Sequence, residues 1–300
     1  MIEKINFKHS LIFFNLCIFI SGFEYFRENN LIFLCLFLIL SIGITHGSLD
    51  HIKGGKLLRL LNIKNKAVFF IGYLTISILT ILIWLVFPKI LLIIFLIVAS
   101  YHFGKEDSDF LRLKKIKYFE ILLFFKGSVV IVSPLLFHQE QTLRIFNSLN
   151  FDIANTLLIS NFILYSILLG SFFVNLYFCS LVNANNKSLL LMDFFSILIL
   201  NFFLNPLLAF TFYFCFLHSV RHSLSLIKEI NSKILIGLKL FIIRALPLTI
   251  ITALLYLITI YFLKNQFGLD QSINKVIFIG LASLTFPHIL LEYFLEKNGK

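Results

Sequence analysis

Long apolar runs recur along the chain from Leu11 to Leu295, and they constrain its fold more than any other feature. A transmembrane helix needs about 20 predominantly apolar residues to cross the hydrocarbon core of a bilayer. Hydrophobic residues make up 59% of the sequence and charged residues only 14%, whereas a soluble domain carries roughly 25% charged residues. We therefore expect an all-α, polytopic integral membrane helical bundle, with residues 1–300 forming a single domain.

Ten apolar segments are candidates for membrane spans, and the fourth and seventh are short, so about 8–10 transmembrane helices are expected. Pro88 and Pro206 mark breaks between segments, because proline disfavours helix in the residue before it. The bulky aromatic residues of Ser21–Asn29 do not resemble a signal-peptide cleavage site, so the first span is expected to remain uncleaved. The candidate segments are Lys8–Phe26, Leu31–Leu49, Lys66–Phe87, Lys89–Phe103, Tyr118–Phe137, Ala154–Val182, Leu189–Leu204, Pro206–Ile227, Leu235–Leu263 and Ile273–Leu295.

The net charge of +11 reflects topology better than it reflects a nucleic-acid partner, because the basic residues fall between apolar runs. With ten spans, nineteen Lys and Arg residues lie on the side of the N-terminus and five on the other side, while Lys126 and Arg244 lie within spans. The positive-inside rule then places both termini in the cytoplasm, with the protein in the inner (plasma) membrane. No nucleic acid is expected as a partner.

The four cysteines all lie inside apolar runs, and no two of them form a CxxC pair. They are Cys17, Cys35, Cys179 and Cys215. We expect small buried apolar residues, neither disulfide-bonded nor metal-binding.

Six of the eight histidines are concentrated in four short motifs. The motifs are HGSLDH (His46–His51), YHFGKED (Tyr101–Asp107), HSVRH (His218–His222) and PHILLE (Pro287–Glu292). Each motif lies toward the C-terminal end of an even-numbered segment. All four are therefore expected on the same side of the membrane, where the histidines can converge in one layer.

Spacing within the motifs is typical of a metal site. His218 and His222 are four residues apart and project from one helix face. A metal-bound imidazole usually donates its other N–H to a carboxylate, carbonyl or water. The same spacing separates a histidine from an acid in three pairs: His46 and Asp50, His102 and Glu106, and His288 and Glu292. A lone intramembrane histidine more often serves another polar role, so the metal prediction depends on the four motifs together. Imidazole suits iron, zinc, copper or nickel, so the ligand type alone does not select the metal.

In this order the four motifs resemble the Brp/Blh family of bacterial and archaeal membrane β-carotene 15,15′-dioxygenases, from His46 to Glu292. The resemblance implies a membrane enzyme of carotenoid catabolism and retinal biosynthesis. Its cofactor would be histidine-bound Fe(II), its substrates β-carotene and O₂, and its product two all-trans-retinal molecules. The lipid bilayer would surround it, and a retinal-binding rhodopsin would be a recipient of the product. The sequence departs mildly from the family pattern at Ser48 and Val220, where alanine and proline are more usual.

Carried over residue by residue, the resemblance assigns functional roles within the same motifs. It implies the metal ligands His46, His102, His218 and His222. Asp50, His51, Glu106, His288 and Glu292 would support these ligands or add one to them. Tyr101, next to His102, is the aromatic residue expected near the substrate and metal.

Three other classes of membrane protein remain as alternatives. A di-iron desaturase or hydroxylase uses clustered HxxxH and HxxHH boxes, and only His218–His222 has such spacing. A histidine-rich transporter with a proton relay would spread its ionisable residues across both leaflets. A bis-histidine haem carrier needs two facing histidines per haem, which leaves the four motifs unexplained. A metal assay combined with an optical spectrum separates these alternatives.

Overall fold

The computed structural model describes residues 2–29, 31–45, 47–111, 116–151 and 160–299. These residues form helices and no strand. Nine helical stretches among them are long and apolar enough to cross a membrane. The expected all-α, polytopic helical bundle is thus confirmed.

The nine stretches include one composite run, in which the π-helix η1 (Ile39–Gly43) and the 3₁₀-helix η2 (Gly47–Leu49) link α3 to α4. They are α1 (Ile2–Gly22), α3–α4 (Ile32–Leu38 and Asp50–Leu60), α5 (Ala67–Val86), α6 (Pro88–Glu106), α7 (Phe119–Phe137), α9 (Asn161–Ser180), α10 (Ala184–Phe203), α13 (Ile234–Phe267) and α14 (Leu269–Asn298).

A tenth helical run corresponds to the segment expected from Pro206 to Ile227. It consists of α11 (Pro206–Phe212), the π-helix η5 (Tyr213–Ser219) and α12 (Val220–Ile230). Shorter helices connect the long ones: α2 (Glu24–Glu28), η3 (Asp109–Leu111) and α8 (Gln139–Ser148).

Several helices extend beyond the apolar runs that predict them. The two segments that looked short, in α6 and α10, have 19 and 20 residues. Pro88 begins α6, and the Asn183 side chain caps α10 by accepting a hydrogen bond from the Asn186 backbone N–H. Prolines at a first helical position and asparagines at an N-cap are both favourable. Polar residues at the helix ends therefore lengthen the spans.

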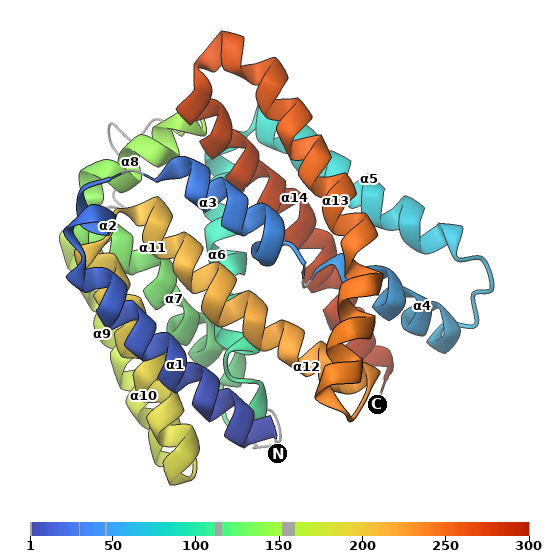
Figure 1. The fold of residues 1–300 in the computed structure, drawn as a ribbon, viewed down its shortest axis with the longest axis horizontal. Helices are drawn as coiled ribbons and strands as arrows, with labels where there is room; N and C mark the ends of the chain where they lie inside the picture. Colours follow the sequence, from blue (N-terminus) through green and yellow to red (C-terminus); the bar gives the residue numbers. More distant parts are fainter. Residues whose placement is uncertain (1, 30, 46, 112–115, 152–159, 300) are drawn as a thin grey trace.

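The π-interrupted run α11–η5–α12 crosses the middle of the bundle (Figure 1). On one side of it lie α1, α9 and α10, with α1 packed on α10 and α9 on α7. On the other side, α14 packs against α13, α5 and α4. The two chain termini lie at the same end of the molecule, and α8 and the α13–α14 turn lie at the other end (Figure 1).

The helices α6 and α7 pack so closely that glycine is required at two contacts. A Cβ atom on Gly104 would lie 1.8 Å from the Leu123 carbonyl oxygen, and one on Gly127 would lie 1.9 Å from the Ser100 carbonyl oxygen. Backbone atoms cannot rotate away as a side chain can. These two glycines therefore fix the position of α6, which carries His102.

The four cysteines are buried and free, which confirms the expected burial and the expected lack of disulfide bonds among them. On the outside of the bundle, α5 and α13 expose many leucine and isoleucine side chains. Such exposed apolar faces are those of helices that border lipid.

Candidate metal centre

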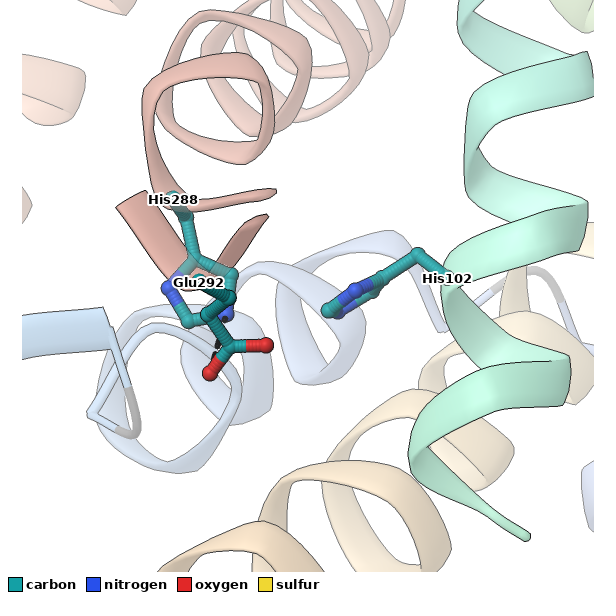
Figure 2. Close-up of side chains that lie close together, drawn as sticks. All are labelled: His102, His288 and Glu292. Carbon is teal, nitrogen blue, oxygen red and sulfur yellow. Dashed lines mark ion pairs between the residues drawn. The ribbon is translucent and has the colours of Figure 1, made fainter. Parts of the chain in front are cut away.

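Four histidine rings from three helical runs gather inside the bundle. His102 lies on α6, His218 in η5, His222 on α12 and His288 on α14. The His102 ring centroid lies 5.2 Å from that of His218 and 5.4 Å from that of His288. The centroids of His222 and His288 are 5.8 Å apart. Figure 2 shows His102 and His288 approaching each other from α6 and α14, with Glu292 beside them. The structure thus brings together histidines from three of the four predicted motifs.

The four histidines do not all lie near the ends of their helices. After His222, α12 continues to Ile230, and after His288, α14 continues to Asn298. Only His102 lies close to the end of its helix, which is Glu106. The motifs are therefore less near the helix ends than the apolar runs predict, because polar residues extend these helices.

Two π-helical turns, η1 and η5, pack against each other beside His218. Side chains bond to backbone carbonyl groups of both turns. The His9 ring Nε2 lies 2.7 Å from the Phe216 carbonyl oxygen, and the Ser219 hydroxyl donates a hydrogen bond to the Gly43 carbonyl at 3.0 Å. Single π-helical turns are rare and frequently occur at functional sites.

Carboxylates from other helices contact two of the histidine rings. His288 Nδ1 lies 2.9 Å from each carboxylate oxygen of Asp50, on α4. His222 Nδ1 lies 3.1 Å from Glu106 Oε2, on α6. Glu106 was expected to partner His102, one turn before it on α6, so its contact with His222 corrects that pairing. Asp50 and Glu106 thus each contact a histidine on a different helix.

Glu292 lies between two possible metal-binding groups. His102, His288 and Glu292 each offer a ligand atom within 4.8 Å of the others, and so do Glu106, His222 and Glu292. Glu292 Oε1 is 3.9 Å from Nε2 of both His222 and His288. His288 and Glu292, which the sequence predicts as a pair, therefore lie near each other, but their side chains are beyond hydrogen-bond length.

A lysine ammonium group lies among these donors. Lys53 Nζ is 2.6 Å from Glu292 Oε1 and 3.2 Å from His222 Nε2. A positively charged side chain thus already contacts two of the candidate metal-binding residues, Glu292 and His222.

His218 lies in a buried environment of its own. Its Nδ1 is 3.6 Å from Asp107 Oδ1, and Asp107 Oδ2 accepts a hydrogen bond of 2.8 Å from the Tyr213 hydroxyl. Burial by itself would raise the pKa of the Asp107 carboxyl, but the neighbouring His218 ring and the positive charges of Lys126 and Arg221 lower this pKa below its usual range.

The other predicted site residues have different positions. His46 lies outside the described residues. His51 Nδ1 lies 2.9 Å from the Ser48 carbonyl oxygen, a contact within its own turn. The Tyr101 hydroxyl donates a hydrogen bond to Glu120, and its ring packs with a smaller apolar cluster that includes residues of α7 and α9. Tyr101 therefore faces α7, and its role near the substrate stays a prediction.

Sequence reasoning did not assign roles to Lys53, Asp107 or Tyr73. Lys53 and Asp107 lie within three residues of predicted site residues, so their proximity was a usable signal. Tyr73 lies in an apolar segment that contains no histidine, and nothing in the sequence sets it apart.

Comparison with known proteins supports the resemblance. The profile of the beta-carotene 15,15'-dioxygenase family matches residues 37–296. The chain belongs to this family. The matched region of this family member contains all four histidine motifs.

One curated relative is the protein named beta-carotene 15,15'-dioxygenase from the uncultured marine bacterium 66A03. It is 28% identical over 267 residues, which cover 87% of this chain and 93% of that protein. No solved structure matches the chain.

Proposed function

We propose that this protein is a membrane-embedded β-carotene 15,15′-dioxygenase with a histidine-bound ferrous cofactor. It uses O₂ to split the central double bond of β-carotene and releases two all-trans-retinal molecules. Family membership and the named activity of the 66A03 relative support the reaction. The observation that carries the proposal is the convergence of histidine rings from α6, η5–α12 and α14 inside the bundle.

The donor set fits a ferrous ion in its ligand type and in the surroundings of its ligands. We assign His102, His218 and His222 as ligands, with His46 as the fourth from sequence. A carboxylate at Nδ1 holds the proton there and leaves Nε2 as the metal-binding atom, which is the arrangement of His222 with Glu106. Bound iron would supply a redox centre that can react with O₂.

Aromatic side chains around the histidines exclude water from the site. The rings of Phe103 and Phe214 lie 4.9 and 5.9 Å from that of His218, and Phe103 is itself buried. β-Carotene is apolar and about as long as the hydrocarbon core is thick, ~30 Å. A site inside a bilayer-embedded bundle admits such a substrate laterally, without transfer through water.

One observation favours a second candidate for the cofactor. Glu292 belongs to both possible metal-binding groups, and a shared carboxylate suits a dinuclear iron centre of the kind that membrane hydroxylases and desaturases use. Iron analysis of the purified protein separates the candidates: one iron per chain supports the dioxygenase centre, and two support the dinuclear one.

Expression in cells that already make β-carotene tests the reaction. Cells with the intact protein should lose their orange colour and accumulate retinal, identified by chromatography. Cells with the His222→Ala variant should stay orange at the same level of membrane protein. Absence of retinal while the intact protein is present in the membrane would refute the proposed reaction.

A further inference from the structure

The helix α5 contributes no histidine to the centre, yet one of its side chains reaches it. Most α5 side chains face outward, and its buried residues Ser77, Thr80 and Trp84 recur at helical spacing. Tyr73 extends this inward stripe by one turn toward the N-terminus of the helix. Because α5 packs against α14 and α4, Tyr73 lies beside the helices that carry His288 and Asp50.

The Tyr73 hydroxyl is within hydrogen-bond distance of two acceptors. It lies 3.0 Å from Asp50 Oδ2 and 3.3 Å from the Leu284 carbonyl oxygen, one turn before His288 on α14. Asp50 in turn contacts His288 Nδ1 with both oxygens at 2.9 Å. Tyr73, Asp50 and His288 thus form a chain of hydrogen bonds from a lipid-facing helix to the histidine cluster.

The chain restricts how His288 can lie. A buried carboxylate is costly unless its oxygens are hydrogen-bonded, and the Asp50 side chain is almost fully buried. The tyrosine hydroxyl satisfies one oxygen without cancelling the negative charge. Asp50 therefore remains a strong acceptor for His288 Nδ1–H, and His288 Nε2 is left facing the group that contains His102 and Glu292.

We propose that Tyr73 is a positioning residue for the metal centre, which acts through Asp50 to fix the orientation of the His288 imidazole. The inference depends on the proposed function only in that a metal binds at the histidine cluster, where His288 Nε2 adds a ligand to those assigned above. It does not depend on the identity of the substrate.

Substitution of Tyr73 by phenylalanine removes the hydroxyl and keeps the ring, which packs 5.6 Å from that of Phe69. Tyr256→Phe is a matched control, because Tyr256 on α13 is buried against α14 and its hydroxyl has no hydrogen-bond partner among the described residues.

Metal-free full-length protein is titrated with Co²⁺ without O₂, and the visible spectrum reports both affinity and geometry. Loss of a side chain that hydrogen-bonds to a metal ligand typically lowers metal affinity 10–100-fold. Tyr73, one bond further out, should change it by about three- to tenfold, with altered Co²⁺ bands, and Tyr256→Phe by less than about twofold.

A double-mutant cycle separates positioning from general destabilisation. If Tyr73 acts through Asp50, the Asp50→Asn/Tyr73→Phe double variant binds Co²⁺ no more weakly than Asp50→Asn alone. Additive losses, parental binding by Tyr73→Phe, or an equal loss in Tyr256→Phe would each overturn the inference. Tyr73→Met, which also lacks the hydroxyl and packs adaptably, gives the same comparison if the phenylalanine variant does not fold. The Co²⁺ titration uses no substrate. If the parent protein makes no retinal, the proposed reaction is overturned, but the Co²⁺ affinities still decide whether Tyr73 positions the metal centre.

Discussion

His222 has both ring nitrogens in contact with charged side chains, Glu106 at Nδ1 and Lys53 at Nε2. As a proposed ligand, His222 supplies a coordinating nitrogen that alanine lacks. His222→Ala should therefore lower bound iron and reduce retinal formation by roughly 100-fold or more, beyond the 10–100-fold typical of outer partners. Iron analysis and product chromatography measure both effects.

The control for this variant is His138→Ala. His138 lies between α7 and α8, outside the helices that carry the clustered histidines. It should keep parental iron content and activity. Full activity in the His222→Ala protein would remove His222 from the proposed ligands.

Lys53 and a metal ion would compete for the same donors, Glu292 and His222 Nε2. Lys53→Met removes the competing ammonium group and leaves Glu292 with an uncompensated buried charge. A neighbouring charge shifts such an equilibrium by about one to three log units, so metal binding should become roughly tenfold tighter.

Lys105→Met is the matched control for Lys53→Met, since Lys105 forms an ion pair of 2.9 Å with Glu296, one turn further along α14. Its metal affinity should stay close to the parental value in a Co²⁺ titration. Weaker binding in Lys53→Met would show that Lys53 supports the centre and does not compete for it.

The sequence predicted which residue types meet at the site, but not which side chains pair. Spacing of four residues correctly marked Asp50 and Glu106 as acids that could contact imidazoles. Their observed partners, His288 and His222, lie on other helices. Those pairings depend on helix rotation and on interhelical packing, which no spacing within one helix encodes.

At the scale of elements, the contact between α6 and α7 determines where His102 lies. Gly104→Ala places a Cβ atom against the Leu123 carbonyl. Because backbone must move to admit it, the variant should lose stability by about 1–3 kcal/mol or more, and it should unfold at a lower temperature in a thermal melt of the detergent-solubilised protein.

Gly72→Ala tests whether this effect belongs to the contact or to glycine loss in general. Gly72 is exposed on α5, and a Cβ atom there meets nothing within 4 Å. Alanine is a better helix former by about 1 kcal/mol, so Gly72→Ala should melt at the parental temperature or slightly above it. A Gly104→Ala protein as stable as Gly72→Ala would contradict the close packing.

Element boundaries were predictable where proline or polar residues punctuate the chain. Pro88 and Pro206 begin α6 and α11 as the sequence indicated. The π-helices η1 and η5 were not predictable, because the residues that contact their carbonyl groups, such as His9 at Phe216, come from elsewhere in the chain. An apolar run also conceals the division of Pro206–Ile230 into three helical parts.

For the whole molecule, composition and apolar periodicity sufficed to predict a polytopic helical bundle, because a chain with so little charge cannot form a water-solvated surface. Two basic residues that the topology count assigned to one side instead form ion pairs inside the protein, where Arg221 is buried and Lys53 is half-buried. Lys53 pairs with Glu292, and Arg221 pairs with Asp193 at 2.6 Å. The bias toward the N-terminal side survives without them, so the orientation stays a prediction with both termini cytoplasmic.

Reporter fusions test this orientation at the π-interrupted run Pro206–Ile230. If that run crosses the bilayer as the eighth of ten passes, its two ends lie on opposite sides, and the end at Ile230 is cytoplasmic. Green fluorescent protein fused after Ile230 should therefore fluoresce, and alkaline phosphatase fused after Phe203 or after Phe137 should be active outside the cytoplasm. Lys228 and Lys233 flank the cytoplasmic end, as the positive-inside rule requires. Reporters after Phe203 and Ile230 on the same side would mean that α11–η5–α12 enters and leaves by one face. His218 and His222 would then lie on a re-entrant segment, and the ten-pass arrangement with both termini in the cytoplasm would be wrong.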